Sequence, residues 1–258
     1  MRRIAVVVHV FAEKRPDYAK MFTAQLSSVV LHPPQTCRIE FEVWTAETDT
    51  LTHRVCAAFQ QHFRQRQTPA SITIHTLPKE QLFRRAIGRN ISFKSCEADV
   101  AWALDCDYLM LEGCLDAIAA VDFFAIKPHE MVFPRNYFQA PDHRAGDQDV
   151  QRISAGSIVE LRLHDYQRRR LRIGIGGLQV VSREIARRGY CDGTSWVKPV
   201  PKAKDFQDTS EDRVYRGSIC SSIPIDVPSL YRLRHVASAF EPEQDRGRRM
   251  KHKRGFAK

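Results

Sequence analysis

The chain has 258 residues, of which 43% are hydrophobic, so it can bury the core of one large domain or two small ones. This composition excludes a disordered or fibrous protein. The longest apolar runs, such as Ile4 to Val10, are far shorter than the roughly 18 to 20 residues of a membrane-spanning helix. The start of the chain lacks a small-residue cleavage site, and we expect a cytoplasmic protein without a transmembrane segment. The seven cysteines form no CxxC pair, which indicates reduced, buried thiols.

Positive charge is concentrated at the end of the chain. The net charge is +10, and residues 245–258 hold seven Lys/Arg and one Asp, which is +6, so the other 244 residues carry +4. We therefore divide the chain into one domain, 1–244, and a basic C-terminal tail, 245–258. Such a tail is attracted to polyanions such as nucleic acid, an anionic membrane or an acidic glycan, although a merely solubilising end has the same composition.

The first hundred residues alternate between strand and helix patterns. A continuous apolar, β-branched run predicts a buried strand at 4–11, and further strands are predicted at 37–46, 71–77 and 99–111. Apolar residues at three-to-four-residue spacing predict helices at 18–30, 51–63 and 79–97. Alternation of this length favours an α/β fold with a mostly parallel sheet flanked by helices on both faces. Ligands bind such sheets at the carboxyl ends of the strands.

The pattern is less regular after residue 120. The polar stretch 127–152 is expected to hold short antiparallel strands and loops. A strand interrupted by glycines is expected at 171–182, and a short helix follows it between a capping Ser182 and a terminating Gly189. A further helix is expected to begin at about residue 210, and 223–236 supplies a late strand.

Two carboxylates one residue apart end a buried strand, in the triplet Asp105-Cys106-Asp107. They cannot share one face of a regular strand, but at a transition from strand to loop they can converge on one ligand. Hard oxygen ligands suit Mg²⁺ or Mn²⁺, which usually complete their coordination shell with substrate phosphates. The triplet alone is a weak signal, and its place after a buried strand strengthens it.

Four segments together resemble GT-A glycosyltransferases of the family 2 type. RRAIGRN before SFKSCEADVAWALDCDYLML is similar to the helix and DxD strand of that family. GIGGLQVVSREIARRGY resembles its acceptor segment, SEDRVYRG its catalytic-base element, and YRLRHV a late His element that binds metal in many members. The resemblance covers about 1–240 by order of elements and implies a GT-A, Rossmann-like fold.

The resemblance implies transfer of a sugar from a nucleotide sugar, with a UDP-sugar expected, to an acceptor hydroxyl. Asp105, Asp107 and His235 would hold Mn²⁺ or Mg²⁺, which neutralises the departing diphosphate. Asp212 would be the general base, although acids in the first turn of a helix are also favoured by its dipole. One base without a carboxylate nucleophile would invert the anomeric centre.

Further residues are assigned to the donor and the acceptor. Arg85 and Arg89 lie four apart on one helix face and suit a diphosphate, although ordinary solvated arginines have the same spacing. The predicted donor-binding residues are Val10, Phe11, Glu47, Arg85, Arg89 and Asp105. The predicted acceptor-binding residues are Gly176, Gly177, Trp196 and Glu211. After the second strand, where the family usually places an Asp, this chain has Thr45-Ala46-Glu47 and then Asp49.

The acceptor stays open between several classes. The basic tail and the arginines at 168–170 favour a polyanion, such as DNA with a hydroxymethylated base in a phage-infected bacterial cytosol. A cell-envelope saccharide or its lipid-linked precursor is the competing acceptor. Two other functions fit the same fold: a non-catalytic nucleic-acid-binding protein, and a nucleotidyltransferase that releases pyrophosphate.

Overall fold

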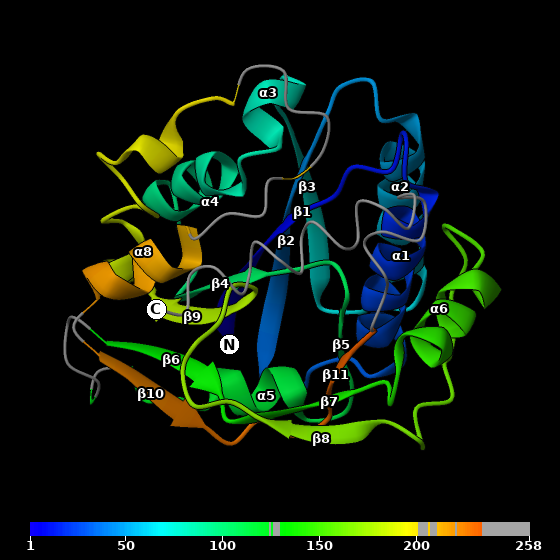
Figure 1. Cartoon of the computed structure of the whole chain (residues 1–258). Coiled ribbons are helices and arrows are strands. Elements are labelled where there is room, and N and C mark those ends of the chain that lie inside the picture. The colour runs from blue at the N-terminus through cyan, green and yellow to red at the C-terminus, as the bar shows by residue number, and fades with distance from the viewer. Residues whose placement is uncertain (124, 126–129, 201–205, 207–210, 220, 234–258) are drawn as a thin grey trace.

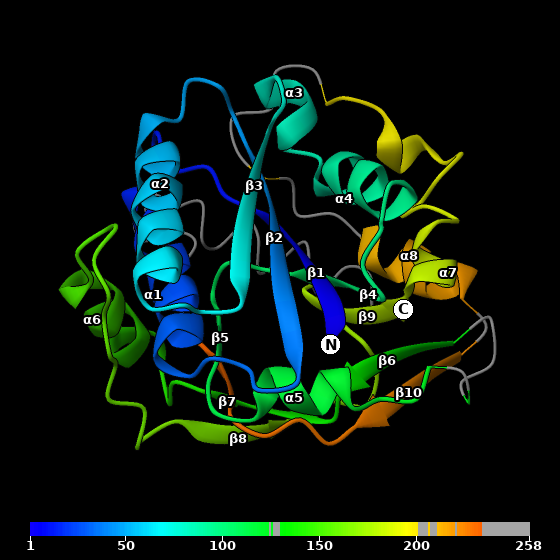
Figure 2. The same ribbon diagram turned by 180° about the vertical axis from the view of Figure 1, so that it is seen from behind.

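The computed structural model describes residues 1–123, 125, 130–200, 206, 211–219 and 221–233. Over these residues the chain forms three layers, with helices on both faces of a central sheet (Figures 1 and 2). None of the helices in the described residues is long and apolar enough to cross a membrane.

The central sheet is mostly parallel. Its strands are β1 (Arg2–His9), β2 (Cys37–Thr45), β3 (Ala70–Thr76), β4 (Val100–Leu104), β6 (Glu130–Pro134), β9 (Leu178–Ser182) and β10 (Ser221–Ile225). They pair in the order β10-β6-β9-β4-β1-β2-β3. Strand β9 is antiparallel to its neighbours β4 and β6, and the remaining pairs are parallel. The predicted α/β class with a mixed, mostly parallel sheet flanked by helices is confirmed.

Each face of the sheet has its own apolar core. Because side chains alternate along a strand, Ile4, Val6 and Val8 of β1 enter one core, whereas Ala5 and Val7 enter the other. The first core is covered by α1 (Pro16–Leu31), α2 (Thr50–Gln65) and α5 (Cys114–Ala119), with α6 (His143–Arg152) beside α1. The second is covered by α3 (Lys79–Leu82), α4 (Arg85–Lys94), α7 (Arg183–Ala186), η1 (Ser195–Val197) and α8 (Glu211–Ser218).

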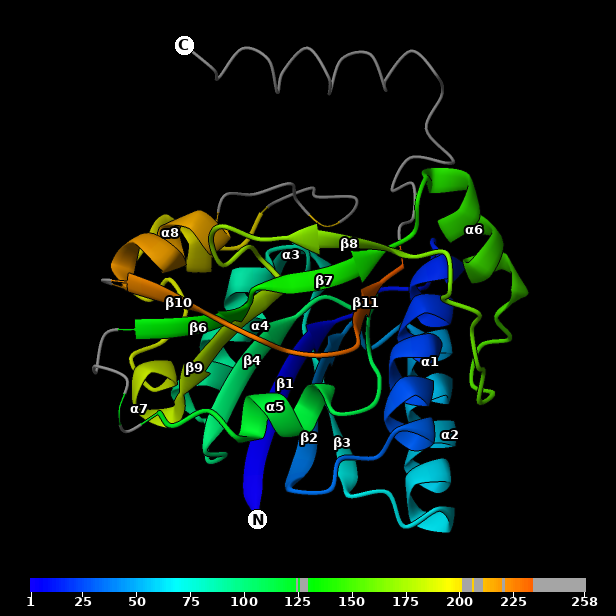
Figure 3. The ribbon, with the colours of Figure 1, turned by 90° about the horizontal axis from the view of Figure 1, so that it is seen from below.

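A second, smaller sheet lies beside the first (Figure 3). It consists of β5 (Tyr108–Met110), β11 (Leu230–Arg232), β7 (Asn136–Gln139) and β8 (Gln167–Arg170), in that order. Its edge strand β8 is exposed along its whole length. The expectation of short strands within 127–152 is thus confirmed by β6 and β7, and α6 was not anticipated there.

Several elements that were expected to be continuous are each divided into two in the structure. The helix expected at 79–97 is α3 and α4, because Phe83 turns into the core and Arg84 leaves the helical conformation. The strand expected at 99–111 is β4 and β5, which belong to different sheets and are joined by the turn 105–107. The strand expected at 171–182 is only β9, and the one expected at 223–236 is β10 and β11.

Helix α1 fixes the turn between β4 and β5. The buried amide of Gln25 donates to the carbonyl oxygens of Asp105 and Tyr108, at 2.9 and 3.0 Å. Buried polar groups are nearly always hydrogen-bonded, and moving this turn would leave the Gln25 amide without its acceptors. Gln25 therefore holds the backbone that carries the two carboxylates.

The six cysteines within the described residues are free and buried, as the sequence indicated. Burial raises the pKa of the Cys37 and Cys56 thiols to about 12. Cys220 lies outside the described residues.

Candidate functional site

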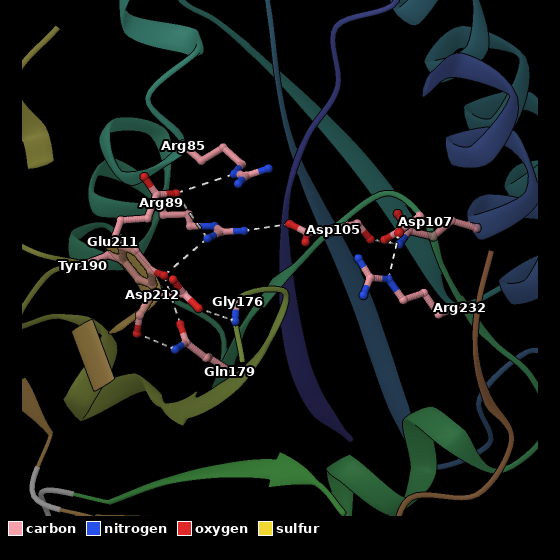
Figure 4. A network of polar contacts seen from close by, with 11 residues as sticks. Arg85, Arg89, Asp105, Asp107, Gly176, Gln179, Tyr190, Glu211, Asp212 and Arg232 are labelled. Atoms are coloured by element: carbon pink, nitrogen blue, oxygen red, sulfur yellow. Dashed lines mark hydrogen bonds and ion pairs between the residues drawn. The ribbon is translucent and has the colours of Figure 1, made fainter. Parts of the chain in front are cut away.

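A polar pocket of about 210 Å³ opens at the carboxyl end of β4. It lies where α4, α8 and the segment before β9 meet (Figure 4). The pocket is lined by Arg85, Arg89, Asp105, Ile175, Gly176, Glu211 and Asp212. Six of these seven residues belong to the sets predicted from the sequence, and Ile175 was not predicted. The fold therefore brings together side chains from three distant parts of the chain.

Arg89 is the centre of the network. Only 2% of its side chain is exposed, and its Nη2 donates to Oδ1 of Asp105 at 3.0 Å. Its Nη1 lies 3.6 Å from Oε1 of Glu211 and donates to the Tyr190 hydroxyl at 3.3 Å. The buried guanidinium is thus balanced by two carboxylates, as a buried charge requires.

Arg85 adds a second positive charge on the same helix. Its Nε lies 3.5 Å from Oε1 of Glu211, so both arginines converge on that buried carboxylate. Burial alone would raise the pKa of Asp105, but Arg85, Arg89 and Arg232 outweigh burial and lower it below its ordinary value. Asp105 is therefore ionised at neutral pH.

Asp212 is oriented by backbone and side-chain contacts. Its Oδ2 accepts from the Gly176 amide at 2.9 Å, and its carbonyl oxygen accepts from Nε2 of Gln179 at 3.0 Å. Gln179 Oε1 accepts in turn from the Tyr190 hydroxyl at 3.0 Å. Burial raises the pKa of Tyr190, which keeps the hydroxyl protonated. A continuous hydrogen-bonded chain therefore joins Arg89 to Asp212 through Tyr190 and Gln179.

The two glycines before β9 allow close approach to the carboxylates. Gly177 has a φ of +84°, and a Cβ placed on it would lie 2.7 Å from Oδ2 of Asp105. A Cβ on Gly176 would lie 3.0 Å from Cβ of Asp212. Only glycine fits at position 177, because the backbone is left-handed there and a side chain would collide with Asp105.

The predicted three-ligand metal site is not assembled by the described residues. Asp107 is 3% exposed, and its Oδ2 accepts from Nε of Arg232 at 2.9 Å. Asp105 turns instead toward Arg89 (Figure 4). Nowhere in the described part of the chain do three or more His, Cys, Asp or Glu side chains form a group that could hold a metal ion. His235 lies outside the described residues, and of the three predicted ligands only Asp105 is shown to line the pocket.

Val10, Phe11, Glu47 and Trp196, which were also predicted, are not among the residues that line the pocket. Val10 and Phe11 are buried after β1, and Phe11 packs against Phe83 with ring centroids 5.0 Å apart. Glu47 is exposed. Trp196 lies under the Arg84 guanidinium, 5.0 Å from its ring centroid, and is not among the pocket-lining residues.

Asp49 performs a structural task. One of its oxygens accepts from the backbone amide of Ala12 at 2.7 Å and from the hydroxyl of Thr52 at 2.6 Å. The other accepts from the Thr52 amide at 3.2 Å, which caps helix α2. The carboxylate therefore joins the segment after β1 to the start of α2, and a capping Asp at this spacing was a signal available in the sequence.

Three functional neighbours were missed by sequence reasoning. Gln179 and Tyr190 complete the chain to Asp212, and Arg232 holds Asp107. Tyr190 and Arg232 belong to segments that carried the resemblance, but nothing in their spacing indicated a partner. Gln179 is a polar residue in a buried strand, a pattern that predicts a hydrogen-bonded group.

Comparisons with known proteins give a fold but no close relative. No protein family model matches the sequence, and no curated protein matches it significantly. Among solved structures, S. aureus TarS 1–349 in complex with UDP-GlcNAc is 14% identical over 89% of this chain and 58% of that one, with a TM-score of 0.53. The mannosyltransferase PcManGT from Pyrobaculum calidifontis, in complex with GDP-Man and Mn²⁺, is 13% identical over 98% of this chain and 62% of that one, with a TM-score of 0.50.

The chain has a GT-A fold. It spans 37% of the longer S. aureus TarS structure, which it matches with 13% identity over 92% of its own length and a TM-score of 0.53. The identities are low, so the likeness concerns the architecture alone. None of these three structures is described as a DNA-modifying enzyme.

Proposed function

We propose that the protein is a glycosyltransferase that moves a sugar from a nucleotide sugar to an acceptor hydroxyl with inversion of the anomeric centre. One observation carries the proposal. Two arginines and the oriented carboxylate of Asp212 line the same small pocket, at the carboxyl end of β4 in a GT-A fold. A leaving diphosphate and an attacking hydroxyl require this combination of positive charge and base.

On the donor side, Arg85 and Arg89 are the residues for the diphosphate. Their guanidinium groups pair with Glu211 and Asp105, which reduces the cost of orienting them when the ligand binds. A guanidinium forms strong charge-assisted hydrogen bonds to phosphate oxygens. The family resemblance supports a UDP-sugar as the donor, and UDP-GlcNAc and GDP-Man are the nucleotide sugars bound in the two similar structures.

The proposed donor site includes a Mn²⁺ or Mg²⁺ ion that Asp105 would help to hold. This carboxylate is ionised, 27% exposed and lines the pocket, whereas Asp107 is occupied by Arg232. Such ions commonly use one or two carboxylates together with substrate phosphates. When bound, the ion would supply charge neutralisation for the departing diphosphate.

On the acceptor side, Asp212 is the general base. Its Oδ2 is directed by the Gly176 amide, and Tyr190 and Gln179 fix the backbone of the residue. The other carboxylates of the pocket, Asp105 and Glu211, are both paired with arginines, so Asp212 is the one carboxylate among the described lining residues without an ion pair to arginine. A single base without a nucleophilic carboxylate corresponds to inversion.

The test is to incubate the purified full chain and Mn²⁺ with UDP- and GDP-sugars and to measure release of nucleoside diphosphate, with Asp212→Asn as the control variant. Release that the substitution abolishes is the expected result. Release of pyrophosphate instead would identify a nucleotidyltransferase. Failure to turn over any donor, together with tight DNA binding, would identify a non-catalytic binding protein.

A further inference from the structure

Four arginines surround two adjoining hollows on the outer side of the second sheet. One hollow, of about 440 Å³, is lined by Arg135, Asn136, Arg168, Arg170 and Asp226. The other, of about 540 Å³, is lined by Arg135, Arg170, Leu171, Arg172 and Pro224. The two share Arg135 and Arg170 and together form one surface, here called the arginine groove. It lies apart from the pocket that holds Asp212, since no residue lines both.

Strand register explains why the arginines gather on one side. Arg170 pairs with Asn136 and Arg168 pairs with Phe138 in the antiparallel β7–β8 ladder. Side chains two residues apart share a face, so Arg168 and Arg170 stand about 7 Å apart along the edge strand, while Arg169 belongs to the opposite face. The Leu171 amide donates to the Arg135 carbonyl oxygen at 2.8 Å, which keeps Arg135 beside the strand.

The charge of the groove is mostly uncompensated. Arg135 Nε lies 3.4 Å from Oδ1 of Asp226, the single acidic residue among those that line the two hollows. Four arginines against one aspartate leave a net charge of +3. The guanidinium fork matches phosphate oxygens, and two arginines that follow one another along the same face of β8 suit a linear anion.

The groove is suited to a phosphate backbone rather than to bases. Single-stranded nucleic acids are held by exposed aromatic rings on which their bases stack. The exposed large apolar residues among those described are Met1, Ile91 and Ile173, none of which is aromatic. None of the residues that line the two hollows is aromatic either, so the arginine groove offers positive charge without a stacking platform.

A short stretch of chain joins the arginine groove to the pocket that holds Asp212. Strand β8 runs toward α8 in Figure 3, and the chain that follows it reaches Ile175 and Gly176 in the pocket wall. Arg172 precedes Gly176 by four residues, which is at most about 14 Å of extended chain. Arg216 of α8 donates to the Gly174 carbonyl oxygen at 2.5 Å and fixes this connection.

We propose that the arginine groove binds a phosphodiester-linked chain, which is the acceptor polymer of the enzyme, and directs one of its hydroxyl groups to Asp212. The statements that the bound chain is the acceptor and that one of its hydroxyl groups reacts rest on the proposed glycosyltransferase function. Binding of the phosphodiester chain itself does not depend on that function.

The probe is an abasic phosphodiester chain, compared by fluorescence anisotropy with an oligothymidylate of equal length and with a carboxylated polysaccharide. We expect the two phosphodiesters to bind equally and the polysaccharide to bind at least tenfold more weakly. Contacts from Arg168, Arg170 and Arg172 to a flexible chain predict a fall in affinity of about 20-fold between roughly 50 and 200 mM salt.

Arg168→Ala with Arg170→Ala removes two of these contacts. We expect affinity to fall at least tenfold and the salt dependence to become shallower, with a slope reduced by about 1.4. Arg169→Ala is the matched control, because it removes the same charge from the opposite face of the same strand and should leave the affinity unchanged. Both variants replace exposed side chains, and circular dichroism verifies their folding.

Three outcomes would overturn the proposal: binding that requires bases, preference for the carboxylated polymer, or equal losses in the double variant and in Arg169→Ala. Thermal stabilisation by UDP with Mn²⁺ is measured on the same samples. Absence of that stabilisation with intact phosphodiester binding would count against the glycosyltransferase and not against the groove. Normal stabilisation without phosphodiester binding would count against the groove alone.

Discussion

Arg89 Nη1 and Glu211 Oε1 lie 3.6 Å apart, and 2% of each side chain is exposed. The pair joins α4 to the first residue of α8, over the core that covers one face of the sheet. Their burial gives the contact two roles. It holds an arginine that lines the pocket, and it fixes the start of the helix on which Asp212 follows Glu211.

Arg89→Met should lower the free energy of unfolding by about 3–5 kcal/mol, because Glu211 and Asp105 both lose the buried guanidinium that compensates them. Glu211→Gln added to Arg89→Met should restore part of the loss, since the unpaired charge is then gone. Denaturant unfolding of the two single variants and the double variant measures the coupling. Strictly additive losses would contradict a direct interaction.

Asp212→Asn should reduce the rate of transfer by about 10²- to 10⁴-fold and leave nucleotide binding unchanged. Asparagine keeps an oxygen that accepts from the Gly176 amide, so the geometry is preserved and only the base is lost. Asp192→Asn is the control, because Asp192 is an exposed carboxylate bonded to Asn90 and Lys94. Equal rates in the two variants would remove Asp212 from its assigned role.

Gly177→Ala should disturb Asp105 directly, whereas Gly193→Ala should not. Both glycines have positive φ, so both substitutions carry backbone strain of about 1–2 kcal/mol. A Cβ at Gly177 would also meet Asp105, while nothing lies within 4 Å of one at Gly193. We expect a nucleotide dissociation constant raised at least tenfold in the first variant alone. Similar constants would show that the close approach is unimportant.

His9 should make the protein less stable as the pH falls. Burial, and then the charges of Arg89 and Arg85, hold the pKa of this histidine well below its ordinary value of 6.5. Below about pH 6.5 the unfolded chain takes up a proton that the folded chain does not, so stability falls with pH by up to about 1.4 kcal/mol per unit. His9→Gln should show a shallower fall between about pH 7 and 5. Parallel curves would refute the assignment.

Asp105→Asn and Asp107→Asn should separate two carboxylates that look equivalent in the sequence. The first should abolish any effect of Mn²⁺ on UDP binding, because Asp105 opens on the pocket. The second should mainly destabilise the fold, because it weakens the buried pair with Arg232. Calorimetry with and without Mn²⁺ measures the first effect. Loss of the Mn²⁺ effect in Asp107→Asn alone would reverse the assignment.

The order of strands and helices was predictable because periodicity is a local property. The run that became β1 is apolar and β-branched, apolar and polar residues alternate in β2 and β3, and the stripes of α1 and α2 repeat with helical spacing. The breaks were less predictable. Nothing in the sequence between Lys79 and Lys94 shows that Phe83 would leave the helix to fill the second core.

The sequence predicted which residues line the site better than it predicted which of them bind one another. Arg85, Arg89, Asp105 and Asp212 were found through spacing and resemblance, and they do share a pocket. That Arg232 binds Asp107 depends on β11 lying beside β5, a pairing between segments more than a hundred residues apart. Such contacts are set by tertiary packing and leave no periodic trace in the chain.

Strand β9 is antiparallel to β4, and this direction places its first residues at the pocket. A strand parallel to β4 would begin at the opposite edge of the sheet, but β9 begins where β4 ends, and so Gly177 meets Asp105. The linker between β8 and β9 is therefore constrained unequally along its length. Sequence changes can be tolerated near Leu171, whereas Gly176 and Gly177 are fixed by Asp212 and Asp105.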